Sequence, residues 1–569
     1  MANISVFNSL TKTSDQFKID GNIIKWYTCG PTVYDSSHLG HARTFLTFDI
    51  IRRIFEYFGY QVFYVMNITD IDDKIIDRVS KLDGLTDENY NEKFKQFVSS
   101  MENEFWQDMD SLNIKRPMVI TRVTEYIDKM IKYIEKLEDD GFAYCSNGSV
   151  YFDVDEYEKR GFNKEPLRNI NNEDAEFNPN SSNVFKDDKK NPYDFALWKK
   201  SKPGELKFES RWGLGRIGWH LECSVMSSDV LGKHIDIHSG GIDLIYPHHQ
   251  CEIMQSNAYE NNQDYQWIKY FLHSGHLNIH GEKMSKSLKN FTTIKYYLEN
   301  IGTSQELRML FLMHKWDKPL DYSKDTIDEA KRVNKRIQDL VDHLQFIMNE
   351  DKPETIFSDV DNEFFQLIDI LKRYIDSLLC DNFNTPMVMK TILDGIPRVY
   401  KYLEKSRNVQ FIKLYFDTLI KITNIFGLEY VSHTQDKDDN NKIKVIELAV
   451  NLQEDIRKLV LDNEVKFDKQ VLENIFNILN DFKDNKLSEA SLLLQDRFGN
   501  TNNKIIELAI NLREDVRKLV LENKTKIDKQ VFGNIFKVLD DFRDNKLPEA
   551  GILLQDRAGD TTKYIISSQ

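Results

Sequence analysis

The hydrophobic pattern of the first 82 residues predicts strands connected by helices. Residues 25–29 and 61–67 (QVFYVMN) are short apolar runs, and the second is typical of a buried strand. Residues 41–58 repeat apolar side chains at helical spacing, and residues 70–82 continue as a second helix. A strand, a helix and another strand in this order form a βαβ unit, so the sequence predicts a parallel sheet.

The next segments predict an interruption of that sheet. Helices are expected over residues 88–112 and 120–140, followed by an exposed strand over residues 149–153. Residues 171–191 are polar and rich in Asn, which indicates a flexible loop. Strand and helix patterns alternate again over residues 218–278, as expected for one sheet that is interrupted and then completed.

The rest of the chain is predicted to be helical and contains a duplication. Residues 293–428 favour helix almost throughout, and residues 431–441 are expected to form a charged linker. Residues 446–461 (IELAVNLQEDIRKLVL) recur as residues 506–521 (IELAINLREDVRKLVL), an offset of 60 residues. Two copies are too few for a solenoid, so we expect a tandem duplication of one small helical module.

Composition narrows the class of protein. At 569 residues and 67.1 kDa the chain exceeds the size of a single core, so several domains are expected. A hydrophobic content of 41% excludes global disorder. The formal net charge of −15 excludes a protein that coats nucleic acid through a basic surface, but it says nothing about a local basic groove.

No signal peptide or membrane span is predicted. Residues 1–16 lack an apolar segment, and no stretch approaches the roughly 18–20 apolar residues of a spanning helix. The five cysteines are widely spaced, which indicates reduced thiols in a cytoplasmic enzyme and argues against a disulfide framework.

The first candidate for chemistry is the segment between the first strand and its helix, residues 29–41 (CGPTVYDSSHLGH). Ligands bind at such a turn of a parallel sheet, because N–H groups at the helix start face the crevice. His38 and His41 can both reach one phosphate, and Gly40 lets a base or ribose approach closely. An isolated HxGH sequence is more often an ordinary loop with capping residues.

Two further loops contain nucleotide-binding patterns of different value. Lys283 and Lys286, within KMSKS, can clamp a polyphosphate and neutralise charge that develops during transfer, although such a run alone is more often a solvated loop. The GxxxxGK[ST] pattern of a P-loop is absent from the sequence. Residues 213–218 (GLGRIG) match GxGxxG, but neither a strand before them nor a long helix after them is predicted. We therefore assign them to a loop.

Four residues have a composition that suits a metal ion. His248 and Glu252 are four residues apart at the start of a predicted helix and share one face. Together with Cys29 and Cys223 they give two thiolates, one imidazole and one carboxylate, which is acceptable to zinc. A core cysteine is the simpler interpretation of each thiol. Spacing alone does not identify the set, because two rival ligands are nearby: His249 and Cys251.

Taken together, the blocks CGPTVYD…HLGH, MNITDIDDKI, GWHLECSVM, HSGGIDLIYPHH and KMSKS, in this order, closely resemble class I cysteinyl-tRNA synthetases. The resemblance runs from about residue 6 to the C-terminus and is strongest over residues 24–80 and 205–320. It implies an α/β fold. A Rossmann-like parallel-sheet catalytic domain is split by a connective insertion and followed by an all-α anticodon-binding bundle and the duplicated small C-terminal module.

The resemblance also implies domain boundaries and site residues. The domains are the first catalytic half (1–112), the insertion (113–215), the second half with the KMSKS loop (216–290), a stem-contact linker (291–345), the anticodon-binding bundle (346–430) and two module copies (431–500 and 501–569). The catalytic residues are His38, His41, Lys283 and Lys286, with Lys286 the usual ATP contact. The zinc ligands are Cys29, Cys223, His248 and Glu252, and the amino-acid pocket contains Gly30, Thr32, Thr69, Trp219, His238 and Asp243. At position 251 the family usually has Asn instead of Cys.

The implied reaction ligates L-cysteine to tRNA(Cys) through a cysteinyl-adenylate, with Zn²⁺ as cofactor and ATP, with Mg²⁺, as co-substrate. Cysteine differs from serine by one atom, which an apolar pocket discriminates weakly but a thiolate-binding zinc ion discriminates strongly, so no editing domain is expected. The expected partners are tRNA, cysteine and ATP, with no membrane and no DNA, in the cytoplasm. A locally basic track for the tRNA is predicted at Lys331, Arg332, Lys335 and Arg336, and the alternative interpretation of these residues is a solvated helix face.

Two other functions compete with this one. Mycothiol-type ligases use the same adenylate to cysteinylate an amino sugar, but they lack a full anticodon region, whereas this chain has 282 residues after KMSKS. An inactive RNA-binding or regulatory relative is less favoured, because both motifs and all four ligand positions are intact.

The duplicated tail departs from the family, which has one copy that typically ends in a GTTW-like run. Neither copy contains tryptophan, since the last one in the chain is Trp316. One hypothesis is that one copy stacks on anticodon bases while the other adds surface or stability. The alternative is a tolerated, redundant copy.

Overall fold

The computed structural model describes residues 2–86, 88–163, 166–167, 188–202, 206–279, 281–284, 290–348, 357–430, 434–463, 466–482, 486, 501–547, 552–555 and 563–566. For residues 434–444, 446–447, 501–507, 552–555 and 563–566 it describes the backbone alone. Lys286 and most of the Asn-rich stretch 171–191 lie outside the described residues, so both predictions made there stay predictions. The chain divides into two compact units, residues 1–430 (the N-terminal unit) and 431–569 (the C-terminal module).

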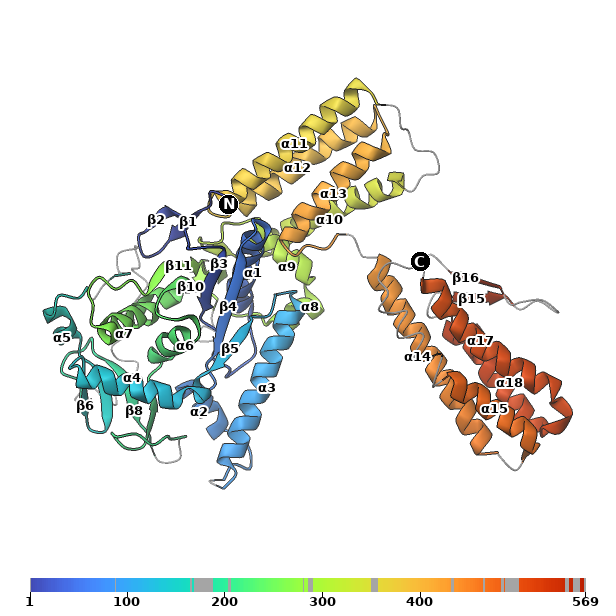
Figure 1. Ribbon diagram of the computed structural model, residues 1–569, viewed down its shortest axis with the longest axis horizontal. Coiled ribbons are helices and arrows are strands. Elements are labelled where there is room, and N and C mark those ends of the chain that lie inside the picture. Colours follow the sequence, from blue (N-terminus) through green and yellow to red (C-terminus); the bar gives the residue numbers. More distant parts are fainter. Residues whose placement is uncertain are drawn as a thin grey trace. The chain divides into compact units, whose positions relative to one another are not determined.

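The centre of the N-terminal unit is a five-stranded parallel sheet, which confirms the predicted fold class (Figure 1). Its order is β11 (Ile268–Ser274), β10 (Ile235–Gly241), β3 (Ile23–Thr28), β4 (Gln61–Ile68) and β5 (Val119–Arg122). Strands β4 and β5 lie on one side of β3, and β10 and β11 lie on the other, so the strand order reverses between β3 and β10. In such sheets, ligands bind outside the carboxyl ends of the strands at this point.

Helices connect and cover these strands. Packed against the sheet are α1 (Leu39–Tyr57), which contacts β4 and β11, and α6 (Leu221–Leu231), which contacts β3 and β4. The other helices and short strands of this part are α2 (Asp73–Ser80), α3 (Tyr90–Ser111), α7 (Gln250–Glu260), α8 (Ile294–Asn300), α9 (Ser304–Leu312), the hairpin β1 (Ser5–Asn8) and β2 (Thr13–Gln16), and the small sheet of β12 (Leu277–Ile279), β13 (Glu282–Lys283) and β14 (Leu320–Asp321).

A four-stranded antiparallel sheet interrupts the parallel one, in the order β6 (Ala143–Ser146), β7 (Ser149–Phe152), β8 (Phe195–Lys200) and β9 (Gly215–Ile217), accompanied by α4 (Ile127–Asp139) and α5 (Val154–Lys159). The helix predicted over residues 120–140 is wrong at its start, because residues 119–122 pair with β4 as the edge strand β5. The prediction that residues 149–153 form an exposed strand is also wrong in its exposure. All of β7 is buried, because β6 and β8 flank it.

The GxGxxG segment is not entirely a loop, as it was predicted to be. Residues 215–217 form β9, and its glycines permit close approach of β8. A Cβ at Gly215 would lie 2.2 Å from the indole nitrogen of Trp198, and one at Gly218 would lie 1.9 Å from the carbonyl oxygen of Ala196. Packing between antiparallel strands therefore accounts for these glycines without a dinucleotide.

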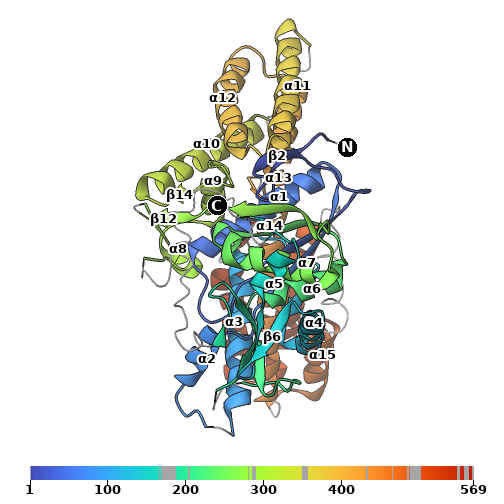
Figure 2. The same ribbon diagram turned by 90° about the vertical axis from the view of Figure 1, so that its left-hand side faces the viewer.

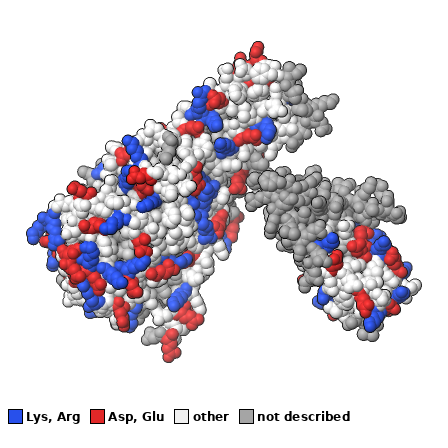
Figure 3. All heavy atoms as spheres, viewed as in Figure 1, with Lys and Arg blue, Asp and Glu red and all other residues white. Residues whose placement is uncertain are grey.

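Four helices form a bundle at the end of the N-terminal unit: α10 (Lys324–Met348), α11 (Asp359–Cys380), α12 (Thr385–Leu403) and α13 (Val409–Ile425) (Figures 1 and 2). In both views this bundle projects from the end opposite β6 and α4. Figure 3 shows basic and acidic side chains interspersed over the face of the protein that is turned to the viewer. Two residues of the predicted basic track have partners on the protein, since Lys331 donates to the Ile301 carbonyl and Lys335 pairs with Asp339.

A buried ion pair connects α1, which packs against the parallel sheet, to α9. The Arg308 guanidinium donates to the Asp49 carboxylate at 2.6 Å and to the Phe426 and Leu112 carbonyls at 3.0 and 2.7 Å. Arg53 donates to the same carboxylate at 2.8 Å. The Arg308 guanidinium thereby connects α9 to Asp49 of α1 and to Phe426 at the end of α13.

The C-terminal module contains α14 (Thr434–Leu461), α15 (Lys469–Asp481), α17 (Thr501–Glu522), α18 (Lys529–Asp541) and the strand pair β15 (Ile552–Gln555) and β16 (Lys563–Ile566). The predicted charged linker is wrong for residues 434–441, which begin α14. Neither Gly nor Pro occurs between residues 434 and 461 to stop the helix extending in the N-terminal direction.

The two copies of the duplicated sequence share one core. Helix α14 packs against α17 and α18, and α15 packs against α17. Equivalent buried residues of both copies meet in it: Ile456 and Val516, Val460 and Val520, Val471 and Val531, Ile475 and Ile535, Leu479 and Leu539. The loops between the helices exchange reciprocal hydrogen bonds, from Asp468 N to Lys526 O at 3.1 Å and from Asp528 N to Lys466 O at 3.2 Å. The copies are therefore related by approximate two-fold symmetry, and each completes the core of the other.

Among the described residues, no helix is both long and apolar enough to cross a membrane.

Candidate active site and metal centre

A cavity of about 480 Å³ opens at the carboxyl ends of the parallel strands, where the strand order reverses. It brings together most of the residues that the sequence predicted: Cys29, Gly30, Thr32, His38, His41, Thr69, Trp219, Cys223, Asp243, His248 and Lys283. His238 and Glu252 are buried beside Cys29, and Lys286 is outside the described residues.

The HLGH segment forms the N-terminus of α1. His38 is the N-cap, with Nδ1 accepting a hydrogen bond from the Gly40 N–H at 3.0 Å, while the His38 N–H donates to His41 Nδ1 at 3.2 Å. The two imidazole rings stack at 3.9 Å. A Cβ at Gly40 would lie 2.8 Å from the His38 ring, so this cap requires glycine there. The helix N-terminus thus presents positive potential to the cavity, beside the two imidazoles.

The segment that follows the KMSKS loop is fixed against this turn. The Leu39 N–H donates to the Thr292 carbonyl at 2.9 Å, and the Ile294 N–H donates to the Ser37 carbonyl at 3.1 Å. From the loop itself, the Lys283 ammonium lies 3.2 Å from the Asp243 carboxylate, and both residues line the cavity. Two motifs that are more than 240 residues apart in sequence are therefore adjacent in the fold.

The four predicted zinc ligands form a compact buried group. Their ligand atoms lie within 4.8 Å of one another. Cys29 Sγ and Cys223 Sγ are 3.5 Å apart, and Cys223 Sγ is 3.6 Å from His248 Nε2. Tetrahedral zinc with Zn–S bonds of about 2.3 Å places two sulfur ligands about 3.8 Å apart. The donor set and its spacing therefore fit a zinc ion.

A second group overlaps the first through Cys29 and Glu252 and adds His238 and His249. His238 Nε2 lies 2.7 Å from Glu252 Oε2, and His249 Nδ1 lies 2.7 Å from His273 Nε2. The rival ligand His249 thus remains chemically plausible, whereas Cys251 belongs to neither group of described residues.

Electrostatics favours ionisation of two of the four donors, Cys223 and Glu252, whereas burial and the neighbouring Cys223 raise the pKa of Cys29 well above its usual range. Burial alone would raise the pKa of Cys223, but hydrogen bonds with Cys29 and His248 lower it to about 6. Burial likewise opposes ionisation of Glu252, yet the surrounding imidazoles of His248 and His238 hold its pKa well below the usual range. Thiolate and carboxylate are the protonation states that bind a metal cation.

On the side of the cavity next to the thiols, the backbone around Gly30 packs closely against Asn67. The Gly30 N–H donates to Asn67 Oδ1 at 2.8 Å, and a Cβ at Gly30 would lie only 1.6 Å from the Asn67 carbonyl oxygen. Thr32 and Thr69 form an isolated parallel bridge. Trp219, which is 37% exposed, stacks on the His248 ring at 4.5 Å.

Two residues of this wall were missed in the sequence. Asn67 orients Gly30, and the buried Glu222 accepts a hydrogen bond from the Thr69 hydroxyl at 2.8 Å. Both belong to the quoted blocks MNITD and GWHLEC, so their position in the motifs was the available signal.

Comparison with solved structures supports the fold. The LeuRS of Agrobacterium radiobacter K84, solved as a ternary complex with tRNA and LeuAMS, matches with a TM-score of 0.52 at 10% sequence identity, covering 72% of this chain and 84% of that chain. At this identity the likeness concerns the fold alone.

Comparison at the level of sequence is more specific. Residues 16–332 match the family model for the class I (C) tRNA synthetase catalytic domain. The cysteine–tRNA ligase of Encephalitozoon cuniculi is 42% identical over 463 residues, covering 81% of this chain and 92% of that protein. The enzyme of the same name from Methanococcus maripaludis C7 is 39% identical, covering 80% of this chain and 92% of that protein. The chain therefore belongs to the cysteine–tRNA ligase family of class I aminoacyl-tRNA synthetases.

Proposed function

We propose that this chain ligates L-cysteine to tRNA(Cys) in two ATP-dependent steps, through a cysteinyl-adenylate, and that a zinc ion selects the cysteine thiol. The observation that carries the proposal is that the metal group and the HLGH turn lie next to each other. The Cys29, Cys223 and His248 side chains of the metal group line the same 480 Å³ cavity as the HLGH turn. A thiol held by this group lies close to a site that favours phosphate.

Cys29, Cys223, His248 and Glu252 would hold the zinc ion. When bound, the ion supplies a Lewis acid that binds a thiolate far more strongly than a hydroxyl, and so distinguishes cysteine from serine. His238 orients the Glu252 carboxylate, while its other ring nitrogen, Nδ1, lies 3.1 Å from the Tyr27 carbonyl. Trp219 covers His248 on the cavity side.

In the first step, a cysteine carboxylate oxygen attacks the α-phosphorus of ATP. A C–O–P bond forms, the bond between the α-phosphorus and the bridging oxygen breaks, and pyrophosphate leaves. No protein nucleophile is needed, so catalysis depends on positioning and on charge stabilisation. The phosphates are stabilised by His38, by His41 and by the first N–H groups of α1. Lys283 also contributes, and Lys286 is included because of its position in the KMSKS motif alone.

In the second step, a ribose hydroxyl of the terminal tRNA adenosine attacks the carbonyl carbon of the adenylate, and AMP leaves. The α11–α13 helices are proposed to contact the anticodon, and the basic residues of α10 to contact the tRNA backbone, with Arg332 and Arg336 exposed for this purpose.

The thiol-selection part is tested by ATP–pyrophosphate exchange with cysteine and with serine, combined with metal analysis of the purified protein. We expect about one zinc per chain and a strong preference for cysteine. Cys223→Ser should lose both metal and preference, while the control Cys251→Ser, a buried cysteine outside both described metal groups, keeps both. Equal exchange rates for cysteine and serine in the unaltered chain would contradict zinc selection.

The acceptor is tested separately, by cysteine-dependent charging of tRNA. Charging distinguishes this proposal from an amino-sugar ligase, which forms the adenylate but leaves tRNA uncharged, and from an inactive relative, which does neither. The bundle of α10–α13 favours tRNA as the acceptor.

A further inference from the structure

The active-site cavity contains a lysine that belongs to neither the HLGH nor the KMSKS segment. Lys74 is the second residue of α2, where its backbone N–H donates to the Asp72 carboxylate at 2.9 Å, and its side chain lines the 480 Å³ cavity. The Lys74 ammonium lies 5.1 Å from the centre of the Tyr34 ring, which is within the range of a cation–π contact. Tyr34 lines the same cavity, so its ring holds the ammonium at the cavity wall.

The carboxylates on the segments around Lys74 pair with other cations. Asp73, the preceding residue, forms an ion pair with Arg216. Asp35, the residue after the tyrosine, forms an ion pair with Arg78 at 2.5 Å. Within the described part of the chain, no carboxylate forms an ion pair with Lys74. Its charge is therefore not neutralised by a neighbouring acid.

The other lysine that lines the cavity differs in this respect. The Lys283 ammonium is 3.2 Å from the Asp243 carboxylate, so that carboxylate already partly neutralises its charge. Of these two lysines, Lys74 is the one whose full positive charge is available to an anionic substrate.

The position of Lys74 connects the two halves of the site. Its segment is held against the preceding loop, because Thr32 and Thr69 form a parallel bridge. Tyr34 follows Thr32 of the proposed amino-acid pocket by two residues and precedes His38 of the proposed phosphate site by four. The ring and the ammonium over it therefore belong to the part of the wall that connects the amino-acid pocket with the phosphate site.

A cation at this place suits the chemistry of the first step. The cysteine carboxylate must approach the α-phosphorus of ATP against the repulsion of a triphosphate, and negative charge develops on the α-phosphate oxygens as the new bond forms. A fixed cation beside these oxygens interacts more strongly with the transition state than with the separated substrates, and so lowers the barrier.

We propose that Lys74 is a catalytic residue of adenylate formation and contacts the α-phosphate oxygens while the cysteine carboxylate attacks. The proposal rests on the function proposed above. When ATP binds, the ammonium moves from the Tyr34 ring to the phosphate. It keeps its proton throughout, so the lysine supplies charge and adds no proton transfer to the reaction.

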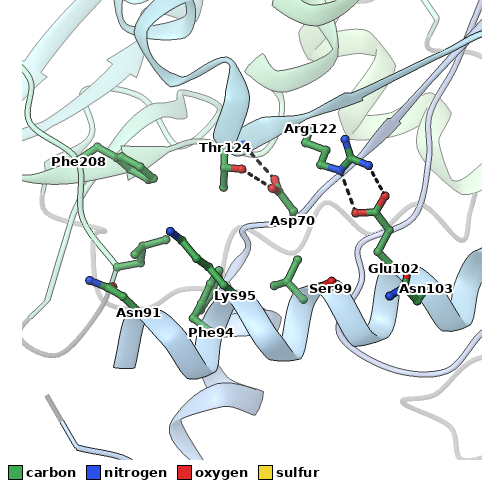
Figure 4. Close-up of a pocket in the computed structure, with 12 residues that line it drawn as sticks. Asp70, Asn91, Phe94, Lys95, Ser99, Glu102, Asn103, Arg122, Thr124 and Phe208 are labelled. Atoms are coloured by element: carbon green, nitrogen blue, oxygen red, sulfur yellow. Dashed lines mark hydrogen bonds and ion pairs between the residues drawn. The ribbon is translucent and has the colours of Figure 1, made fainter. Parts of the chain in front are cut away.

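The test measures cysteine-dependent ATP–pyrophosphate exchange with the full-length enzyme. Lys74→Ala should lower kcat about 100-fold, as for loss of one donor to a developing oxyanion, and change the KM for cysteine little. Two other lysine variants serve as matched controls that should leave exchange unchanged. Lys81→Ala removes an exposed lysine at the end of the same helix, where it pairs with Asp77 at 2.6 Å. Lys95→Ala removes a lysine of α3 that lines a different cavity, of about 720 Å³ (Figure 4).

Two further variants distinguish a catalytic charge from a structural role. Lys74→Arg keeps the cation and should recover about ten-fold of the activity lost in Lys74→Ala. Tyr34→Leu removes the ring but keeps the lysine, so it should lower kcat less than Lys74→Ala does. Thermal unfolding of Lys74→Ala should match that of the Lys81→Ala control, because the Lys74 side chain is exposed.

The outcomes separate this inference from the proposed function. An unchanged kcat in Lys74→Ala, or a raised KM for cysteine with kcat unaltered, would overturn the catalytic role of Lys74 and leave the proposed function intact. Absence of cysteine-dependent exchange in the unaltered enzyme would instead contradict the proposed function.

Discussion

The N-terminal unit and the C-terminal module bury different kinds of side chain. The N-terminal unit buries charged and titratable groups at its sheet edge and interfaces, including Asp49, Arg308, His248, His249 and Glu252. Among the described residues of the module, the buried polar side chains are Gln453 and Arg513, against a core of apolar residues from both copies. Buried charge requires fixed partners and marks sites of chemistry, whereas a symmetric apolar core needs only complementary shape.

The largest expected effect comes from deleting one copy. Removing residues 501–569 exposes the α14 and α15 faces that contain Val460, Val471 and Ile475, so the remaining copy should lose cooperative folding. Hydrogen exchange should show α15 losing protection while the parallel sheet keeps it. A deletion variant whose first copy stays fully protected would favour the redundant-copy hypothesis.

Next in size is the buried ion pair of the N-terminal unit. Asp49→Asn leaves Arg308 buried without its anion, and we expect a loss of about 3–5 kcal/mol in the free energy of unfolding of this unit. Denaturant unfolding measures it, with Asp339→Asn, in the exposed pair with Lys335, as the control that should change little.

The same pair predicts an acid dependence. Burial opposes ionisation of Asp49, but Arg308 and Arg53 lower its pKa below the ordinary value of about 3.9. A lowered folded-state pKa stabilises the fold above that ordinary value and loses its contribution as the pH falls through the folded pKa. Stability of the N-terminal unit should therefore fall on acidification below about pH 4, and less steeply in Asp49→Asn. An identical acid slope in that variant would rule out Asp49 as the responsible group.

The symmetry of the module is tested by a pair of equivalent truncations. Ile475→Ala and Ile535→Ala remove fully buried side chains at matching positions, and each should destabilise the module by about 2–5 kcal/mol. Because the core is shared, each change should raise hydrogen exchange in both copies. Loosening confined to the altered copy would show that the copies fold independently.

The smallest expected effect is a gain in stability, from a substitution at a position where the two copies of the module have different residues. Gly533 lies inside α18, where the first copy has Glu473 in α15, and a Cβ there would meet nothing within 4 Å. Gly533→Ala should stabilise the module by about 0.5–1 kcal/mol in thermal or denaturant unfolding, because glycine is a poor helix former. Glu473→Ala, the matched change in the first copy, should have a much smaller effect.

Local pattern and motif order predicted much of the catalytic region. The βαβ unit of β3, α1 and β4 followed from hydrophobic periodicity, and the HLGH and KMSKS segments identified the residues that meet around the cavity. Prediction failed where neighbours far apart in sequence determine the structure. Residues 119–122 have a helix-compatible pattern but pair with β4, and the GLGRIG glycines are explained by Trp198 and Ala196 of the adjacent strand.

The sequence by itself determined the family, the parallel sheet and the identity of the candidate ligands, because these depend on residue types and on short-range periodicity. Only the tertiary structure decided that Asn67 and Glu222 support the pocket and that His249 joins a second ligand group. It also decided that the repeated copies are two halves of one core. The physical reason is that contacts between distant segments depend on complementary surfaces, and one-dimensional spacing does not encode which surfaces meet.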